Sequence, residues 1–295
     1  MSIFKRQILI AVVFVLLSQV ATLAARAQQQ QPNASGLRMT SVGAELPESL
    51  LRIFATEVDV FGVKVLATAS TQKAKVMHAA NVLAQYLDND ADGEPDNALV
   101  IQAMRKNKAT LVMFATSAEA EKAFRLLENA GELLDDRIMQ DLYGEETHPA
   151  GASQGVFDAA YEEVLHLITH AGYAHAYPGI FGERPGTKLS IAMDRARGRR
   201  FLKVPARYPA KAWYTYDDET CDYGCQTTEY IYWGLTSLLG AQDFPGRMEE
   251  IKHEWRLNTP ESFENGDPAL YQLLTDRRYG FPTILPDGNY TPNPN

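Results

Sequence analysis

The residues of this chain best suited to chemistry lie in the segment 161–170, which reads Tyr-Glu-Glu-Val-Leu-His-Leu-Ile-Thr-His. At about 100° per residue, Glu163, His166 and His170 fall within an arc of about 60° on one helix face. Two imidazoles and a carboxylate form a common set of zinc ligands. The spacing predicts a zinc site with His166 and His170 as ligands and with Glu163 or Glu162 as catalytic base or further ligand. The alternative is the solvated face of an ordinary amphipathic helix.

A metal held by two histidines needs a further ligand from elsewhere in the chain. Glu229 is the first candidate because it lies on a predicted helix, 226–240, that directly follows Cys221 and Cys225. In an exported protein, two cysteines this close predict a small disulfide loop, which would fix the start of that helix. His175 is the second candidate, since it lies just beyond the histidine helix. The alternative for Glu229 is a surface glutamate on an aromatic helix.

The histidine helix resembles that of the zincin metallopeptidases. Their signature is HExxH, in which the glutamate after the first histidine is the general base, whereas Leu167 follows His166 here. Gly172 and His175 are similar to the glycine and third histidine of the metzincins, with one residue missing. The resemblance implies zinc-dependent hydrolysis of peptides. Since the base position departs from the signature, one of the two glutamates before His166 would have to serve instead.

Residues 88–97 form an acidic segment, Asp-Asn-Asp-Ala-Asp-Gly-Glu-Pro-Asp-Asn, between two predicted helices. Carboxylates at alternate positions can turn inward together if Gly93 supplies a sharp bend, and calcium prefers such an array of oxygens. The segment resembles the calcium loops of EF-hand proteins and of thrombospondin type-3 repeats, although Pro95 and Leu99 depart from the EF-hand pattern. An acidic turn without an ion is the alternative. The predicted calcium ligands are Asp88, Asp90, Asp92, Glu94 through its carbonyl, and Asp96.

The first 27 residues have the features of a secretory signal peptide. Lys5 and Arg6 precede an apolar run over 8–16, and the segment closes on a small-x-small cleavage site that ends at Ala27. Residues 28–46 are Gln-rich and then polar, which indicates a flexible leader. We therefore expect a secreted or periplasmic protein that does not associate with membranes after the signal peptide is cleaved.

The charge of the chain restricts its partners. The formal net charge is −9, and loss of Lys5, Arg6 and Arg26 with the signal peptide would change it to −12. An acidic surface argues against nucleic acid and anionic lipid and is compatible with divalent cations. A peptide or protein substrate is the expected partner.

Hydrophobic periodicity and β-branched runs predict an α+β protein, mainly helical with a small sheet, in a zincin-like or similar single large domain over 47–295. Strands are expected over 58–69, as one or two strands, and over 110–115. A Gly/Pro-rich segment marks a possible subdomain junction near 177–185. The predicted helices cover 47–57, 73–87, 97–106, 117–130, 153–172, 226–240 and 246–256.

These patterns predict an exported metal-dependent hydrolase, similar to a zinc metallopeptidase, with a structural calcium loop. The alternative is a non-catalytic secreted protein that binds calcium and recognises a partner through the aromatic residues between Tyr208 and Trp233, although such a set is also typical of a core. A glycosidase is a third class, using a carboxylate pair such as Asp217/Asp218 or Glu162/Glu163. The sequence leaves it open because the separation of two carboxylates depends on the fold.

Overall fold

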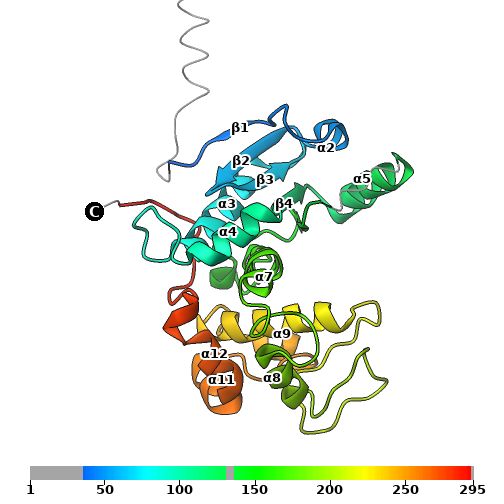
Figure 1. Cartoon of the computed structure of the whole chain (residues 1–295), viewed down its shortest axis with the longest axis vertical. Helices are drawn as coiled ribbons and strands as arrows, with labels where there is room; N and C mark the ends of the chain where they lie inside the picture. Colours follow the sequence, from blue (N-terminus) through cyan, green and yellow to red (C-terminus); the bar gives the residue numbers. More distant parts are fainter. Residues whose placement is uncertain (1–35, 131–135, 294–295) are drawn as a thin grey trace, which may run out of the picture.

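A five-stranded sheet organises the first half of the protein (Figure 1). The structure is a computed structural model that describes residues 36–130 and 136–293, and the predicted signal peptide, 1–27, lies outside these ranges. The strands lie side by side in chain order; the first three pair antiparallel, and the third, fourth and fifth pair parallel. They are β1 (Met39–Ser41), β2 (Thr56–Val60), β3 (Val63–Ala67), β4 (Thr110–Phe114) and β5 (Met139–Tyr143).

Helices cover both faces of this sheet: α2 (Glu48–Ile53) and α5 (Ser117–Ala130) on one face, α3 (Lys73–Leu87) and α6 (Ala160–Ile168) on the other. Successive strand residues point to opposite faces. Val65 and Leu111 accordingly belong to the core with α3 and α6, whereas their neighbours Leu66 and Val112 belong to a smaller core with α2 and α5. The sheet thus gives α6 a fixed, apolar support.

The chain continues from α6 through a π-helical turn over Thr169–Tyr173 into α7 (Ala174–Ala176). In this turn Gly172 allows close packing against α4 (Ala98–Lys106), because a Cβ there would lie only 2.7 Å from a methyl of Val100. Four later helices lie together below α7 in Figure 1: α8 (Lys188–Ala196), α9 (Tyr223–Leu238), α11 (Pro260–Gly266) and α12 (Pro268–Leu274). A shorter helix, α10 (Arg247–Ile251), precedes α11.

The start of α9 is fixed by two local features. Cys221 and Cys225 form the predicted disulfide, and the side chain of Asp222 accepts a hydrogen bond of 2.9 Å from the backbone N–H of Cys225. An aspartate at this position satisfies an N–H group that the first turn of a helix leaves without a partner. The helix that carries Glu229 therefore has a defined origin.

The aromatic residues between Tyr208 and Trp233, considered above as a surface that recognises a partner, belong largely to the core. Tyr214, Tyr230 and Tyr232 are fully buried, and the first two pack against the indole of Trp255. Tyr214 and Trp255 also form an isolated antiparallel β-bridge. Core packing, rather than an exposed aromatic groove, therefore accounts for these residues.

The prediction of a mainly helical α+β protein with a small sheet is confirmed. The predicted helix 47–57 is wrong at its end, because the helix stops at Ile53 and β2 begins at Thr56. The predicted flexible leader, 28–46, contains β1, which pairs with β2 at the sheet edge. Within the described ranges no helix combines the length and the hydropathy that a membrane span requires.

Candidate metal centre

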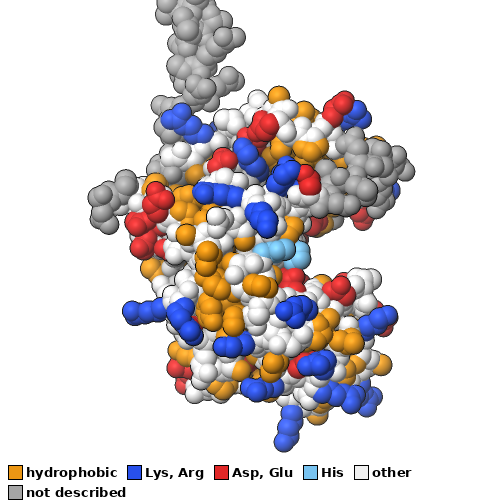
Figure 2. Space-filling model, viewed as in Figure 1, with side chains coloured by type: hydrophobic (Ala, Val, Ile, Leu, Met, Phe, Trp, Pro, Cys, Tyr) orange, Lys and Arg blue, Asp and Glu red, His pale blue; other side chains and the backbone are white. Residues whose placement is uncertain are grey.

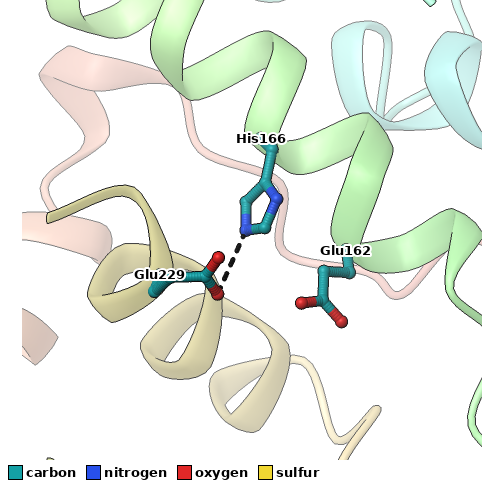
Figure 3. Close-up of side chains that lie close together, drawn as sticks. All are labelled: Glu162, His166 and Glu229. Atoms are coloured by element: carbon teal, nitrogen blue, oxygen red, sulfur yellow. Dashed lines mark ion pairs between the residues drawn. The ribbon is translucent and has the colours of Figure 1, made fainter. Parts of the chain in front are cut away.

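Two helices bring three metal-ligating side chains together: Glu162 and His166 on α6 and Glu229 on α9 (Figure 3). Each residue offers a ligand atom within 4.8 Å of the other two. His166 Nε2 lies 3.5 Å from Glu229 Oε2 across the space between the helices. Because Glu162 and His166 are four residues apart, both project from one face of α6. A cation placed among these atoms would be within reach of all three.

The apolar side of α6 determines where this face points. Val164, Leu165 and Ile168 are buried in the core, and α6 packs against β4, β5 and α3. The polar face is left toward α9, where Glu229 lies one turn after the N-terminal disulfide. The local pattern of apolar and polar residues on α6 thus directs His166 toward the second helix.

The imidazole of His166 is held from its other side. Its Nδ1 faces Glu163 Oε2 at 3.4 Å, and the same oxygen accepts a 2.6 Å hydrogen bond from the Gln140 amide on β5. Because Glu229 Oε2 lies at a similar distance from Nε2, the imidazole stands between two carboxylates, and a cation at Nε2 would take the place of a proton there. Nε2 is buried and has no hydrogen-bond partner among the described residues. A cation that displaces the Nε2 proton could therefore bind between Glu162 and Glu229, with the Nδ1 side of the ring facing Glu163.

The site carries an excess of buried negative charge. Burial raises the pKa of Glu162 to about 8, and the nearby Glu229 carboxylate adds to this effect. Burial alone would lower the pKa of His166, but Glu229 and Glu163 outweigh it and raise that pKa well above its ordinary value. Burial and Glu229 also raise the pKa of the Tyr216 hydroxyl, which contacts the Glu229 carboxylate. A bound cation would relieve the repulsion between the Glu162 and Glu229 carboxylates.

The structure does not bring His170 or His175 into this group. His170 Nδ1 lies 2.5 Å from Glu183 Oε2, and its side chain is 49% exposed. The π-helical turn begins at Thr169 and is wider than an α-helical turn, so residues that an α-helix would align with His166 are displaced around the axis. His175 is exposed on α7. The two histidines of the predicted pair therefore have different partners: His166 lies with Glu162 and Glu229, and His170 lies with Glu183.

Glu163 and Glu162, the two predicted base candidates, lie on different sides of the imidazole. Glu162 belongs to the ligand group, whereas Glu163 faces Nδ1 and the sheet. Asp217 and Asp218, the other carboxylate pair suggested by the sequence, are both exposed, and Asp218 Oδ1 accepts hydrogen bonds from Thr220. Neither adjacent pair therefore presents two carboxylates to one enclosed space.

A second group of metal-ligating residues was not predicted. Asp217, His253 and Glu254 have ligand atoms within 4.8 Å of one another, although the first two are exposed. Burial raises the pKa of Glu254 to about 7, and Glu229 contributes to the rise, so this group lies within electrostatic reach of the first. Nothing in the sequence around residues 253–254 identifies it, because its members are brought together by the pairing of two distant segments, through the bridge between Tyr214 and Trp255 and the hydrogen bond from the Thr215 N–H to the Glu254 carbonyl.

The acidic loop is folded around Asp88. Ligand oxygens of Asp88, Asp90 and Asp96 lie within 4.8 Å of one another, and Gly93 has the left-handed φ of +98° expected for the bend. Asp92 instead caps the backbone N–H of Glu94 at 2.9 Å. Three of the predicted carboxylates thus converge, and the Asp92 carboxylate lies outside that group. Glu94, predicted to bind through its backbone carbonyl, has an exposed side chain.

The molecular surface is hollowed between the part that carries the sheet and the part that carries α9, and histidine side chains are visible at this hollow (Figure 2). This is the level at which α7 faces α9 in Figure 1. Comparison of the chain with protein-family models, curated proteins and solved structures finds no match.

Proposed function

We propose that this protein is an exported metal-dependent hydrolase that binds zinc through Glu162, His166 and Glu229 and acts on peptides. The observation that carries the proposal is the position of His166 Nε2, which is buried, makes no hydrogen bond within the described residues, and lies in one group with two carboxylates from different helices. A buried polar atom without a partner costs free energy, so such an arrangement favours a ligand that is not part of the chain.

The chemistry of the donor atoms favours zinc. One imidazole nitrogen and two carboxylate oxygens leave a fourth position for water in a tetrahedral site. When bound there, zinc would lower the pKa of water and polarise a substrate carbonyl. Glu163 would act as a positioning residue, because it orients the imidazole from Nδ1. Glu162 would serve as a ligand and not as the general base.

Metal analysis of the purified mature protein tests this proposal. We expect about one zinc per chain by mass spectrometry after dialysis, with loss of the metal in His166→Ala and Glu229→Gln. His175→Ala is the matched control, since it removes an exposed histidine from the adjoining helix. A library of quenched fluorescent peptides should be cleaved by the zinc-loaded protein and by the control variant, and not after treatment with a chelator.

The other function classes give different results in the same assays. A glycosidase that uses a carboxylate pair would keep its activity after chelation. A non-catalytic calcium-binding protein would retain no zinc and cleave no peptide. Either result would exclude the proposed hydrolase.

The second part of the proposal is that the acidic loop binds calcium for stability. Asp88, Asp90 and Asp96 supply three converging carboxylates. Repulsion among them contributes to the raised pKa of Asp96, for which burial is the largest cause. Hard cations prefer oxygen ligands of this kind. The test is the melting temperature of chelator-treated protein with and without calcium.

A further inference from the structure

His170 forms a histidine–carboxylate pair next to the proposed zinc site. Its Nδ1 donates a 2.5 Å hydrogen bond to Glu183 Oε2, and Glu183 Oε1 accepts a 2.9 Å hydrogen bond from the hydroxyl of Thr228. Glu183 is only 15% exposed, whereas His170 is half exposed. The carboxylate is therefore anchored, and the imidazole it holds reaches solvent.

This pair is attached to both helices of the metal centre. His170 follows His166 by four residues, and Thr228 directly precedes Glu229 on α9. The two imidazoles are near enough for His166 to oppose protonation of His170. Glu183 therefore ties the segment after α6 to α9 beside the three proposed ligands.

The orientation of the ring leaves one nitrogen free. Because a carboxylate only accepts hydrogen bonds, the proton of neutral His170 lies on Nδ1 and the lone pair lies on Nε2. No described residue donates a hydrogen bond to Nε2, since the only hydrogen bond of this imidazole is the one to Glu183. A histidine fixed by a carboxylate at Nδ1 and open at Nε2 is suited to accept and return a proton.

We propose that His170, oriented by Glu183, is the proton-transfer residue of the hydrolytic site. This inference rests on the proposed function and supplies the base that the missing HExxH glutamate would otherwise provide. In the reaction a water oxygen forms a bond to the scissile carbonyl carbon, and His170 Nε2 accepts one proton from that water. The carbon–nitrogen bond then breaks, and His170 returns the proton to the leaving nitrogen. Glu183 stays ionised throughout and stabilises the charged imidazole.

A purely structural role for the pair is the competing explanation, because the same contacts also join the π-helical turn to the loop before α8. The two roles differ in the effect of pH. Glu183 raises the pKa of His170, while burial and His166 oppose the rise and Asp222 adds to it. A base must be unprotonated, so the pH profile of kcat/KM should rise through the pKa of His170. Glu183→Gln removes the charge that raises this pKa, so the rise should move to lower pH in that variant. If the pair has only a structural role, Glu183→Gln would lower kcat/KM at every pH without moving the rise of the pH profile.

The experiment compares His170→Ala, Glu183→Gln and the control His175→Ala, each loaded with zinc, on a fluorogenic peptide cleaved by the wild-type protein. We expect His170→Ala to lower kcat by about 10²- to 10⁴-fold, the usual contribution of a general base, with KM changed less than about threefold. Zinc content should stay at the wild-type value. Unchanged kcat, or loss of zinc in His170→Ala, would overturn the proposal.

A measurement without substrate separates failure of this inference from failure of the proposed function. In nitrogen NMR spectra of zinc-loaded protein labelled at histidine, we expect His170 to carry its proton on Nδ1 and an unprotonated, metal-free Nε2. Zinc on Nε2, or a proton there in the neutral ring, contradicts the inference even if peptides are cleaved. Absence of bound zinc from the wild-type protein contradicts the proposed function first and removes the basis of this one.

Discussion

The hydroxyl of Tyr290 donates a 2.5 Å hydrogen bond to the carboxylate of Asp88, which lies 202 residues earlier in the chain. Asp88 is fully buried, and its oxygens also accept backbone hydrogen bonds from Asp92 and Gly93. The backbone of Asn293 donates to the Ala91 carbonyl at 2.7 Å, and the C-terminal segment runs back past this loop (Figure 1). Residues 290–293 therefore lie against the acidic loop.

Removing this hydroxyl should destabilise the protein. In Tyr290→Phe the buried Asp88 carboxylate loses one of its three donors and keeps the two backbone N–H groups, and a hydrogen bond to a charged group contributes about 1.5 to 3 kcal/mol. We expect the free energy of unfolding, measured in urea, to fall by about that amount. Tyr271→Phe is the control, because that residue is only partly buried on α12 and its hydroxyl interacts with Glu264. An equal loss in both variants would assign the effect to something other than the Asp88 bond.

Calcium should stabilise the protein through the same loop. We expect millimolar calcium to raise the melting temperature of chelator-treated protein by several degrees, because an ion that binds only the folded state adds its binding free energy to stability. Asp90→Asn and Asp96→Asn should remove the shift, and Asp243→Asn, at an exposed position elsewhere, should retain it. Identical melting curves with and without calcium in the wild-type protein would remove the loop from the proposed function.

Helices with strong hydrophobic periodicity were predictable from the sequence. Strands that form because they pair with another strand were not. Residues 73–87 alternate apolar and polar residues at helical spacing and form α3 over that same range. In contrast, β5 has only one buried residue, Leu142, and its other residues are half-buried without an alternating apolar pattern. It is a strand because it pairs in parallel with β4, a relationship that local composition does not contain. The edge strand β1 was missed for the same reason.

The candidate site shows the same division. The disulfide loop pointed to Glu229 as the ligand from a second helix, and the structure places Glu229 beside His166. The expectation for His170 assumed that α-helical geometry continues to residue 170, whereas it ends at Ile168. A π-helical turn has no clear sequence signal. The partner of His170, Glu183, lies in a loop whose position depends on the whole fold.

Glu163→Gln should weaken zinc binding without removing a ligand. Glu163 contacts His166 Nδ1 at 3.4 Å and is itself held by Gln140. Loss of a residue that orients a ligand usually lowers metal affinity by about 10- to 100-fold. Competition with a chromogenic chelator measures this change, and Glu145→Gln, an exposed glutamate, provides the comparison. Wild-type affinity in Glu163→Gln would show that the imidazole needs no support from Nδ1.

Loss of the disulfide should affect both stability and the metal site. Replacing Cys221 and Cys225 by serine opens a loop of about five residues, for which the chain-entropy relation gives about 2 kcal/mol. Because Glu229 lies one turn after this loop on α9, zinc affinity should fall as well. Urea unfolding and zinc competition on the same samples measure the two effects. A stability loss with unchanged zinc affinity would mean that the rest of α9 is enough to position Glu229.

The stability of the metal-free protein should depend on pH through Glu162. Burial and the Glu229 carboxylate raise its pKa from 4.5 to about 8 in the folded state. Between these two pH values the folded protein holds a proton that the unfolded chain has lost, so the free energy of unfolding falls as the pH rises and stays low above 8.

Glu162→Gln removes this dependence, because an amide does not ionise. The chelator-treated variant should match the wild-type protein near pH 4.5 and exceed its free energy of unfolding at pH 9 by several kcal/mol, since one unit of pKa corresponds to about 1.4 kcal/mol and the pKa of Glu162 is raised from 4.5 to about 8. Urea unfolding at both pH values measures the difference, and Glu261→Gln, an exposed glutamate on α11, controls for the loss of one surface charge. Zinc should reverse the order at pH 9, because it would bind the ionised carboxylate of Glu162 and not the amide. A variant that is less stable than the wild-type protein at pH 9 without metal would show that the Glu162 carboxylate is already satisfied by the chain itself.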